Sequence, residues 1–491
     1  MTRIPVLSAT AGLVVAALSL LVAPDPPRPG TATSGDAALA ARVAAVLGDD
    51  TEGYRGLSVA LIEGGRTTTT TLGDPGGGPL FEIGSTTKTM TAMLFADLVA
   101  DGTVRPADTL GDTLPAARFT DPDTASITLE ELASQRSGLP RLTPGYATLL
   151  RSVLTGYTGG NPYAGQDAGA LLDAARDVSP GAQRGHVGYS NLGLALLGQA
   201  LAARTGIAYP QLVTERILRP LGMSATVVDP PADLPGRATG GTATGRATAA
   251  WTGPGWAPAG IGPVSTAADM AKLVAATMAG TAPGADAATP RFTDDDGTGR
   301  IGWAWFTDRY GEREVTWHNG GTGGFRSYVG FDRSAGTGVV VLGNTDRDVE
   351  WIGLRLLGAQ PPASYLSRSP GAWRVGATLV LLLWGATALP LLASAPGRPR
   401  SRWRGTPDRL RAVAAVLSTA AVLLLVHRIG TWQVIAPWWW AVAAGAAAAG
   451  GVVLAVRWRG LPTVADGRRP LRWTGFGLSA AVSALVAVVV S

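Results

Sequence analysis

The sequence predicts an α+β protein: an antiparallel sheet flanked by helices, with a mainly helical insertion, followed by an all-α membrane segment. Strand patterns occur at residues 56–72 and again at 314–342, with helical periodicity between them. Four long, nearly uncharged apolar stretches then follow. Hydrophobic residues make up 46% of the 491 residues, which is high for a purely soluble protein.

Residues 1–30 have the pattern of an export segment. Arg3 precedes 21 uncharged residues, Ile4 to Pro24, as in a secretory signal peptide or an uncleaved signal anchor. The segment has no clear small-x-small cleavage site, which favours the anchor.

Residues 31–360 are expected to form one exported domain. Ser34 to Asp50 has the alanine-rich periodicity of a helix, and residues 56–63 and 66–72 are predicted to be two strands joined at Gly64-Gly65. Ser85 to Asp101 has apolar residues at helical spacing, so Ser85 is predicted to begin a helix.

The middle of this domain is predicted to be mainly helical. Residues 108–220 include the helical segments Leu171 to Asp177 and Leu192 to Arg204, and residues 233–250 and 280–299 have the composition of surface loops. Strand signals return at Glu314 to His318, 325–332 and 339–342. One sheet built from both ends of the domain is therefore expected.

Residues 361–491 are predicted to form four transmembrane helices, at about 375–396, 410–428, 436–456 and 473–491. Buried helices of a soluble protein are the alternative. Two intervening loops are rich in arginine: Arg398, Arg400, Arg402, Arg404, Arg409 and Arg411 in one, and Arg457, Arg459, Arg468, Arg469 and Arg472 in the other. Positive loops stay in the cytoplasm, so we expect a multi-pass protein of the cell membrane with its large domain extracytoplasmic.

The charge and composition restrict the partners. The net charge of +5 comes mostly from these two loops, so no nucleic-acid partner is expected. The lipid bilayer is an expected partner, and small residues from Gly445 to Gly451 could pack helices within the bundle or against a membrane partner. The absence of cysteine means that disulfides do not hold the exported domain.

Ser85 and Lys88 form the most informative motif, because the chain has only two lysines. A lysine one helical turn from a serine can take up its proton and create a nucleophile. At the start of a helix, free backbone amides also favour developing negative charge.

Two further segments supply candidate partners. Tyr189 and Asn191 flank a serine at the entrance to an apolar helix, where a tyrosine beside a buried lysine could become a phenolate or relay a proton. An ordinary helix cap would look the same. His318, Gly320 and Gly321 end a strand, where backbone amides could face a substrate, although a lone histidine is often a plain core residue.

Other chemistries lack their motifs. The three histidines have no metal-ligand spacing, Ser85 is not in a G-x-S-x-G elbow, and no Walker or dinucleotide sequence follows a strand. No metal and no cofactor are expected.

The ordered motifs resemble the serine β-lactamase and penicillin-binding protein superfamily, most closely its class C-like branch of esterases and D-amino-acid peptidases. Ser-x-x-Lys lies at Ser85 to Lys88, Tyr-x-Asn at Tyr189 to Asn191, and His-x-Gly at His318 to Gly320, where many members have Lys-Thr-Gly. The resemblance covers roughly residues 36–350 and implies the β-lactamase/transpeptidase-like fold.

The resemblance implies a role for each candidate. Ser85 would attack an acyl carbonyl, while Lys88 and Tyr189 would share general-base and general-acid work. Asn191 would orient the substrate and Lys88, His318 would line the substrate side of the edge strand, and the amides of Ser85 and Gly321 would form the oxyanion hole.

Two departures from the family pattern affect the expected function. Gln135-Arg136 stands where the family frequently has His-Thr, a difference that concerns loop packing. His318 stands where many members have a lysine, so this chain lacks a permanent cation that can hold a substrate carboxylate. Arg326 could substitute as an anion clamp, or it could be a solvent-facing strand residue.

The expected function is a membrane-anchored extracytoplasmic serine hydrolase that acts through an acyl-enzyme on a cell-wall peptide or a small ester or amide. Two alternatives are a non-catalytic or slowly turning over cell-wall binding or sensor protein, and a true β-lactamase. Use of the C-terminal helices as a transport path is disfavoured, because they contain no acids or paired charges.

Overall fold

The computed structural model describes residues 3–144, 151, 155, 158–295, 297–362, 372–394, 408–464 and 469–490. The chain divides into two compact units. One comprises Pro27–Ala243 and Ala247–Ser367, and the other comprises Met1–Pro26, Thr244–Arg246 and Arg368–Ser491.

The first unit is built on one antiparallel sheet of nine strands in the order β1-β3-β2-β11-β10-β9-β8-β7-β6. In this order the strands are Thr33–Gly35, Arg66–Gly73, Gly56–Glu63, Thr337–Gly343, Arg326–Asp332, Arg313–Gly321, Phe306–Tyr310, Gly299–Ile301 and Phe292–Thr293. The hairpin β2-β3 turns at Gly64-Gly65, and β2 pairs with β11, so that Leu57 lies opposite Gly343. The expectation of an α+β domain with one sheet from both of its ends is confirmed.

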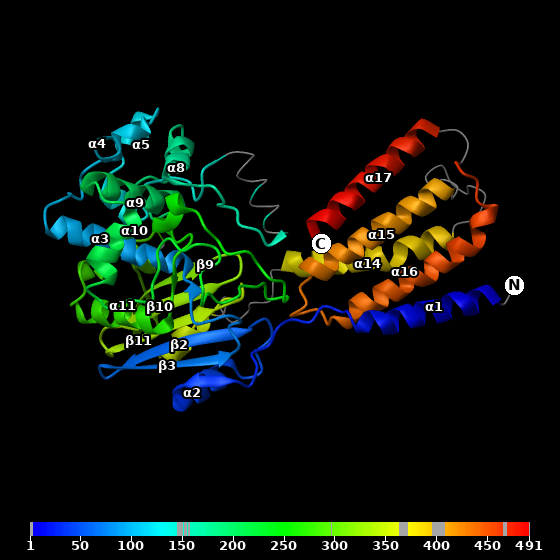
Figure 1. Ribbon diagram of the computed structural model, residues 1–491, viewed down its shortest axis with the longest axis horizontal. Helices are drawn as coiled ribbons and strands as arrows, with labels where there is room; N and C mark the ends of the chain where they lie inside the picture. The colour runs from blue at the N-terminus through cyan, green and yellow to red at the C-terminus, as the bar shows by residue number, and fades with distance from the viewer. Residues whose placement is uncertain are drawn as a thin grey trace. The chain divides into compact units, whose positions relative to one another are not determined.

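The alternation of side chains along β2 produces two cores, one on each face of the sheet. Leu57, Val59 and Leu61 pack with α2 (Ala37–Leu47) and α12 (Glu350–Leu356). Ala60 and Ile62 point to the opposite face, into the larger core that includes α3 (Thr87–Ala100), α9 (Asn191–Thr205) and α11 (Ala267–Ala279). Figure 1 shows α2 below the sheet and α3 and α9 above it.

The helical insertion consists of short elements around α9. They are α4 (Leu110–Thr113), η2 (Pro115–Ala117), α5 (Pro122–Ala125), α6 (Leu129–Ala133), α8 (Ala168–Ala175), α10 (Tyr209–Val213), the π turn η3 (Thr214–Leu218) and η4 (Pro254–Ala259). A second, two-stranded sheet joins β4 (Phe81–Glu82) to β5 (Val264–Ser265), immediately before Ser85 in the chain. The strand before the candidate nucleophile is therefore tied to the end of the insertion.

The sequence-based assignments differ from the structure mainly at the sheet edge. Strands β6, β7 and β8 were not anticipated, and the stretch 280–299 contains η5 (Ala285–Ala288) and β6 instead of being only a loop. The reason is that these strands have two to five residues, too few to establish an alternating pattern.

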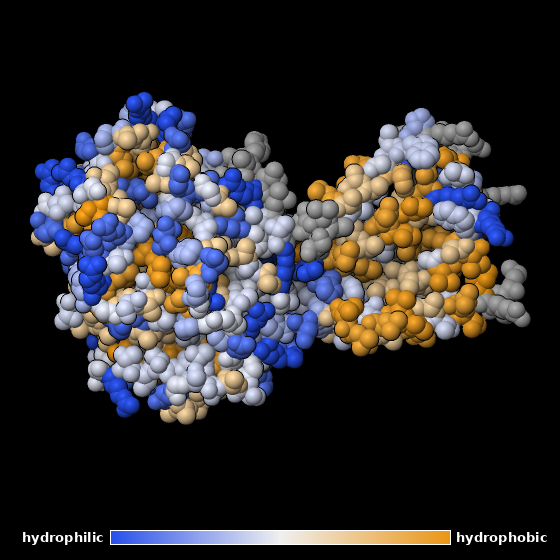
Figure 2. Space-filling view, viewed as in Figure 1, coloured by the Kyte–Doolittle hydropathy of each residue, from blue (hydrophilic) through white to orange (hydrophobic). Residues whose placement is uncertain are grey.

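The second unit contains long apolar helices. They are α1 (Arg3–Leu20), α14 (Ala372–Ser394), α15 (Arg409–Ile429), α16 (Trp438–Arg457), which continues into the 3-10 turn η6 (Trp458–Gly460), and α17 (Arg469–Val490). Three described helices, at Trp373–Ser394, Arg409–Ile429 and Trp438–Gly460, are long and apolar enough to cross a membrane. The fourth expected span is helical, as α17, and its crossing stays a prediction. Figure 2 shows a largely hydrophobic surface over the helices of this unit.

The N-terminal helix α1 packs closely against α16. A methyl group added at Gly445 would lie 2.6 Å from the Gly12 carbonyl oxygen and 2.7 Å from Ala16 Cβ, so the two helix backbones approach where side chains are smallest. His427 Nε2 lies 2.8 Å from the carbonyl oxygen of Val22, just beyond α1. The basic loop residues Arg398, Arg400, Arg402, Arg404 and Arg468, from which orientation was predicted, lie outside the described residues.

Candidate active site

Ser85 lies in a 3-10 turn, η1 (Gly84–Thr86), that leads directly into α3. The Thr86 hydroxyl donates a 2.7 Å hydrogen bond to the Ile83 carbonyl, which stabilises this turn. Lys88, in the first turn of α3, donates 2.8 and 2.6 Å hydrogen bonds to Ser85 Oγ and to the Ala259 carbonyl oxygen. The structure therefore brings Ser85 and Lys88 together in the predicted way.

Lys88 is fully buried, and this determines its charge. Burial, with a smaller contribution from the nearby Arg141 guanidinium, lowers the pKa of the Lys88 ammonium well below its usual 10.5. No carboxylate contributes to this shift. A neutral amine that contacts a serine hydroxyl can accept its proton.

The turn around Ser85 is enclosed by backbone on two sides. A methyl group added at Gly260, which has a φ of +103°, would collide with the Gly84 carbonyl and lie 2.8 Å from the Ser85 nitrogen. One added at Gly320 would also lie 2.8 Å from the Ser85 nitrogen, and one at Gly84 would lie 2.7 Å from the Gly321 nitrogen. The Ser85 and Gly321 amides are therefore neighbours, as a two-amide oxyanion hole requires.

Tyr189 lies beside this pair, with its ring centroid 4.9 Å from Lys88 Nζ. Burial raises the pKa of Tyr189 to about 12, although a hydrogen bond with Ser85 and the charge of Arg141 act in the opposite direction. Tyr189 is therefore a neutral phenol at physiological pH. Of the two options considered from the sequence, the proton relay fits this state and the phenolate does not.

The next residues begin α9 and fix the position of Tyr189. Ser190 is the N-cap, and its hydroxyl accepts a 2.9 Å hydrogen bond from the Gly193 amide. Gln135 Oε1 accepts a 2.7 Å hydrogen bond from the Ser190 amide, so Gln135 has a packing role. The Asn191 side chain is almost fully buried, and its Oδ1 accepts no hydrogen bond from the described residues. Ser190 is therefore an ordinary helix cap, and Tyr189 and Asn191 on either side of it stay candidate site residues.

His318 is completely buried in β9, with its ring centroid 6.3 Å from that of Tyr189. Its Nδ1 lies 2.6 Å from the Asn319 carbonyl oxygen, which can only accept, so Nδ1 carries the proton. Burial, and then the charge of Lys88, lower the His318 pKa to about 3. The imidazole is thus neutral, and Nε2 presents a lone pair that has no hydrogen-bond partner among the described residues.

Comparison with known proteins identifies the family of the chain. The profile of the family described as Beta-lactamase matches residues 36–359. The chain belongs to the β-lactamase family. Residues 36–359 accordingly have the β-lactamase-like fold that the sequence predicted.

Individual relatives in the β-lactamase family have modest sequence identity to this chain. The D-alanyl-D-alanine-carboxypeptidase/endopeptidase AmpH of Escherichia coli is 35% identical over 190 residues, which are 37% of this chain and 47% of that protein. A β-lactamase of Pseudomonas fluorescens is 25% identical over 344 residues, 59% of this chain and 88% of that protein. The chain thus spans about half the length of AmpH, the relative with the higher identity.

Solved structures of the β-lactamase family share the fold of this chain. The D-alanine carboxypeptidase AmpC from Burkholderia cenocepacia has a TM-score of 0.53 and 24% identity, over 65% of this chain and 99% of that one. The class C β-lactamase from Rhodobacter sphaeroides has a TM-score of 0.53 and 23% identity, over 66% and 98%. At these identities the likeness concerns the fold alone.

The arginines of this β-lactamase-family domain do not lie as the sequence suggested. Arg326 donates to Asp348 and to the carbonyl oxygens of Thr322 and Phe325, so it is already paired and is not free to clamp an anion. Arg141 was not among the candidates, yet its guanidinium carbon lies 5.2 Å from the Tyr189 ring centroid. The only sequence signal was its position after Ser137-Gly138-Leu139-Pro140.

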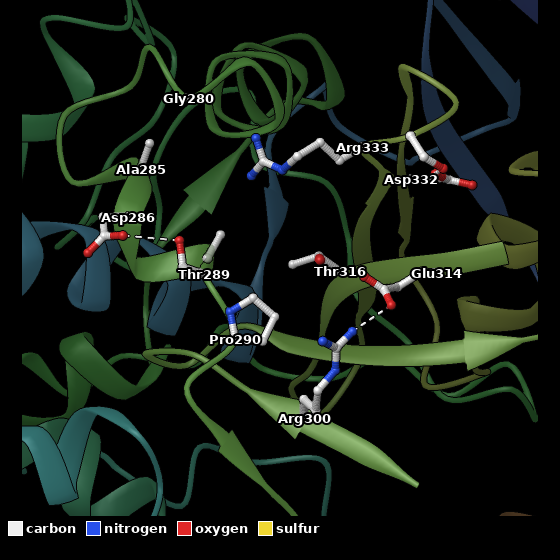
Figure 3. A pocket seen from close by; sticks show the side chains of 12 residues that line it. Gly280, Ala285, Asp286, Thr289, Pro290, Arg300, Glu314, Thr316, Asp332 and Arg333 are labelled. Carbon is white, nitrogen blue, oxygen red and sulfur yellow. Dashed lines mark hydrogen bonds and ion pairs between the residues drawn. The ribbon is translucent and has the colours of Figure 1, made fainter.

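A cavity of about 510 Å³ lies away from the catalytic constellation, near the beginning of β9. Figure 3 shows Arg333 and Arg300 on opposite sides of it, with Thr316 of β9 between them. Arg300 is paired with Glu314, and Arg333 donates to carbonyl oxygens at the end of α11. These charged groups are already neutralised or hydrogen-bonded, so the cavity has no evident role in acyl transfer.

Proposed function

We propose that this protein is a membrane-anchored, extracytoplasmic serine hydrolase that acts through an acyl-enzyme on a cell-wall peptide or a small ester or amide. The observation that carries the proposal is the 2.8 Å hydrogen bond between Ser85 Oγ and a buried lysine whose pKa is strongly lowered. A buried neutral amine in this position supplies the base that a serine nucleophile needs.

The first half of the reaction follows from the contacts. Lys88 Nζ takes the proton of Ser85 Oγ as the oxygen attacks the acyl carbonyl, and the amides of Ser85 and Gly321 stabilise the resulting oxyanion. The phenol of Tyr189 gives its proton to the leaving group and recovers one from the Lys88 ammonium. Expulsion of the leaving group breaks the scissile bond and leaves an ester on Ser85.

Hydrolysis of this ester completes the cycle. A water molecule gives its proton to Lys88, directly or through Tyr189, and attacks the ester carbonyl. Ser85 Oγ then leaves and regains a proton. Asn191 would orient Lys88 or the substrate, and its buried Oδ1 accepts no hydrogen bond from the described residues.

Relatives support the substrate class and the helices support the location. AmpH and the Burkholderia protein are named as carboxypeptidases for D-alanine peptides, which makes a cell-wall peptide the first substrate to test. The apolar helices support the membrane location. Anchoring predicts that full-length protein stays in the pellet after alkaline carbonate extraction, and its release would contradict anchoring.

The mechanism is tested by covalent labelling of the full chain in detergent. A fluorophosphonate probe should label wild type and Ser126→Ala, a control at an exposed serine of the insertion, but not Ser85→Ala. Equal labelling of Ser85→Ala would refute the mechanism. A thiol or amine product that appears as a burst followed by a steady rate would separate a turning-over enzyme from a slowly acylated sensor.

β-Lactam hydrolysis is the second candidate, favoured by the Pseudomonas fluorescens β-lactamase, of which the match covers 88%. The neutral His318 weighs against it, since many family members have a cationic lysine there. If the protein hydrolyses a chromogenic cephalosporin at a higher steady rate than D-Ala-D-Ala peptides, β-lactam hydrolysis becomes the first candidate function.

A further inference from the structure

The turn after α6 places Gln135 in a backbone conformation that a residue with a side chain rarely adopts. Gln135 directly follows the C-cap Ser134, and its φ is +59°, in the left-handed region. Its amide donates a 3.2 Å hydrogen bond to the Leu132 carbonyl, and the Arg136 amide donates one of 2.7 Å to the Glu131 carbonyl. These two bonds form a Schellman motif, in which this position is usually glycine. The turn alone therefore favours glycine and does not explain a glutamine.

The side chain of Gln135 adds a second cost to the strained backbone. It is completely buried. Its Oε1 accepts a 2.7 Å hydrogen bond from the Ser190 amide, and because a backbone amide can only donate, the bonded atom is the oxygen. Its Nε2 then has no hydrogen-bond partner among the described residues. A buried donor without a partner and a left-handed backbone both destabilise a fold, and residues that retain such strain gather at functional sites.

The two acceptors of Gln135 hold the chain on both sides of Tyr189. The Gln135 carbonyl oxygen accepts a 2.7 Å hydrogen bond from the Gly188 amide, and Oε1 accepts the bond from the Ser190 amide. Tyr189 is the residue between these two donors. Gln135 thus fixes the backbone immediately before and immediately after the phenol that forms a hydrogen bond with Ser85.

The helix that carries Gln135 is itself firmly anchored. At the start of α6, Thr128 and Glu131 form a reciprocal capping box. Glu131 also accepts hydrogen bonds of 2.9 and 3.0 Å from Arg184, which belongs to the segment that leads to Tyr189. This segment is therefore attached to α6 through Arg184 and again through Gln135, which leaves it little freedom to shift.

We propose that Gln135 is a positioning residue, which holds Tyr189 where its phenol can give a proton to the leaving group. The proposal rests on the acyl transfer proposed at Ser85 and adds to it the residue that aligns the general acid. A general acid must lie within hydrogen-bond distance of the atom that it protonates, and a misplacement of about 1 Å can cost about 100-fold in rate.

Two esters with the same acyl group test the alignment of the acid. p-Nitrophenyl acetate and ethyl acetate both give an acetyl ester on Ser85, so a difference between their kcat/KM values comes from the leaving group. p-Nitrophenolate leaves as a stable anion, whereas the ethoxide oxygen must receive a proton as its bond to the acyl carbon breaks. Release of acid, followed in a pH-stat with the full chain in detergent, measures both reactions.

Gln135→Met keeps the length of the side chain and removes its acceptor. It should lower kcat/KM for ethyl acetate by about 10- to 100-fold, and it should leave p-nitrophenyl acetate hydrolysis and fluorophosphonate labelling almost unchanged. Gln135→Glu, which keeps an acceptor oxygen at the same distance along the side chain, should restore most of the reaction with ethyl acetate. Gln199→Met is the matched control: it removes a 3.1 Å hydrogen bond from a half-buried glutamine of α9 to the Gly255 carbonyl, and it should behave as wild type.

The position of Tyr189 can also be observed directly. 3-Fluorotyrosine incorporated at position 189 should give a fluorine NMR signal that shifts or broadens in Gln135→Met and keeps its wild-type position in Gln199→Met. If Gln135→Met does not fold, Gln135→Gly takes its place, because glycine adopts a φ of +59° without strain and also lacks the acceptor.

The outcomes separate this proposal from the proposed function. If Gln135→Met slows both esters equally, or leaves the ethyl acetate reaction or the fluorine signal unchanged, the role of Gln135 is wrong while acyl transfer at Ser85 stands. If Gln199→Met has the same effects as Gln135→Met, the role of Gln135 is again wrong. If wild type hydrolyses neither ester although Ser85 is labelled, the fluorine signal decides. If the fluorophosphonate does not label Ser85, the proposed function fails and the role of Gln135 fails with it.

Discussion

The amine of Lys88 and the carbonyl oxygen of Ala259 are joined by a 2.6 Å hydrogen bond, which fixes the lysine between η4 and the nucleophile. The Ala259 carbonyl oxygen accepts a hydrogen bond from one N–H of Lys88. When the amine is neutral, its lone pair lies within hydrogen-bond distance of Ser85 Oγ. The burial that lowers the pKa of Lys88 therefore also supports the role that we propose for it, as the base.

The pH dependence of acylation should follow this lowered pKa. The reactive form has neutral Lys88, so the acylation rate should rise with pH through the lowered pKa and then stay level, since Tyr189 loses its proton only near pH 12. Lys88→Arg should lower the rate by about 10²- to 10⁴-fold at every pH, because a guanidinium stays protonated. Stopped-flow measurement of probe labelling provides the profile, and a rate that falls between neutral and mildly alkaline pH would contradict a lysine base.

Burial of Lys88 should also make stability depend on pH. Between the lowered pKa and 10.5 the unfolded chain binds a proton on Lys88 that the folded chain does not, so the free energy of unfolding rises with pH. Lys88→Met removes this dependence. The melting temperature of Lys88→Met minus that of wild type should therefore decrease from about pH 7 to about pH 10.

The chain provides its own control for this comparison. Lys272 is the other lysine, and its side chain is 44% exposed. Lys272→Met tests the general effect of removing a lysine at the same two pH values. A constant difference between Lys88→Met and wild type would mean that Lys88 is charged in the folded protein.

Gly260 should be essential for the position of the nucleophile. Gly260→Ala would collide with the Gly84 carbonyl and crowd the Ser85 amide, so acylation should fall by about 100-fold or more, as for loss of an oxyanion-hole donor. Gly262→Ala is a close control: Gly262 has a similar φ of +108°, but its added methyl would meet no atom closer than 3.8 Å. Measuring the labelling rate and the melting temperature of each variant separates loss of activity from loss of stability. If Gly260→Ala and Gly262→Ala lose equal activity, backbone strain alone explains both losses.

Glu82 and Arg237 form a buried ion pair that holds the segment after Arg237 against β4. Their side chains are 1% and 7% exposed, the atoms lie 2.7 Å apart, and Glu82 also accepts from the Trp251 amide. Burial raises the pKa of Glu82, and Arg237 opposes this. Arg237→Met should cost about 3 to 5 kcal/mol of unfolding free energy, because it leaves a buried carboxylate unpaired.

A double-mutant cycle tests this account of the pair. Glu82→Gln combined with Arg237→Met should be more stable in denaturant titration than Arg237→Met alone. Additive losses from the two substitutions would show that the two side chains do not interact.

The packing of α1 on α16 predicts that the N-terminal helix is retained in the mature protein. A methyl at Gly12 would lie 3.1 Å from Ala449 Cβ, close to the separation of about 3.5 to 4.5 Å found in disulfides. In the cysteine-free chain, Gly12→Cys with Ala449→Cys should cross-link on mild oxidation. Gly12→Cys with Gly451→Cys should not, since a methyl at Gly451 would lie within 4 Å of none of the described residues.

The cross-link is assayed as an intramolecular shift on non-reducing gels, together with the intact mass. A mature chain that lacks residue 12 would show that the segment is a cleaved signal peptide.

Local patterns in the sequence were enough to predict the parts of the site that are local in space. Ser85 and Lys88 are one turn apart, so their contact depends only on α3 and its preceding turn. Strands β2 and β11 contain apolar runs, and β3 is a run of β-branched threonines, over seven or eight residues, which made them recognisable.

Contacts between distant segments could not be predicted in this way. The sequence suggested that Arg326 could be free to bind an anion, but its guanidinium donates hydrogen bonds to Asp348 and to two carbonyl oxygens. Tyr189 was considered as a phenolate, but its pKa depends on burial by distant elements. Arg141 has no motif of its own, and its importance appears only once α9 places Tyr189 beside it.

The pairing of β2 with β11 bears on how the domain is synthesised. Leu57 cannot meet Gly343 until the ribosome has made nearly the whole domain, so Ser85, Lys88 and Tyr189 all emerge long before the central strands that complete the sheet around them. Such non-local pairing folds slowly. A nascent chain that stops before β10 carries the proposed nucleophile, base and proton relay, but lacks the strands that complete the sheet. Acyl-transfer activity should therefore arise late and abruptly during biogenesis, when β11 pairs with β2.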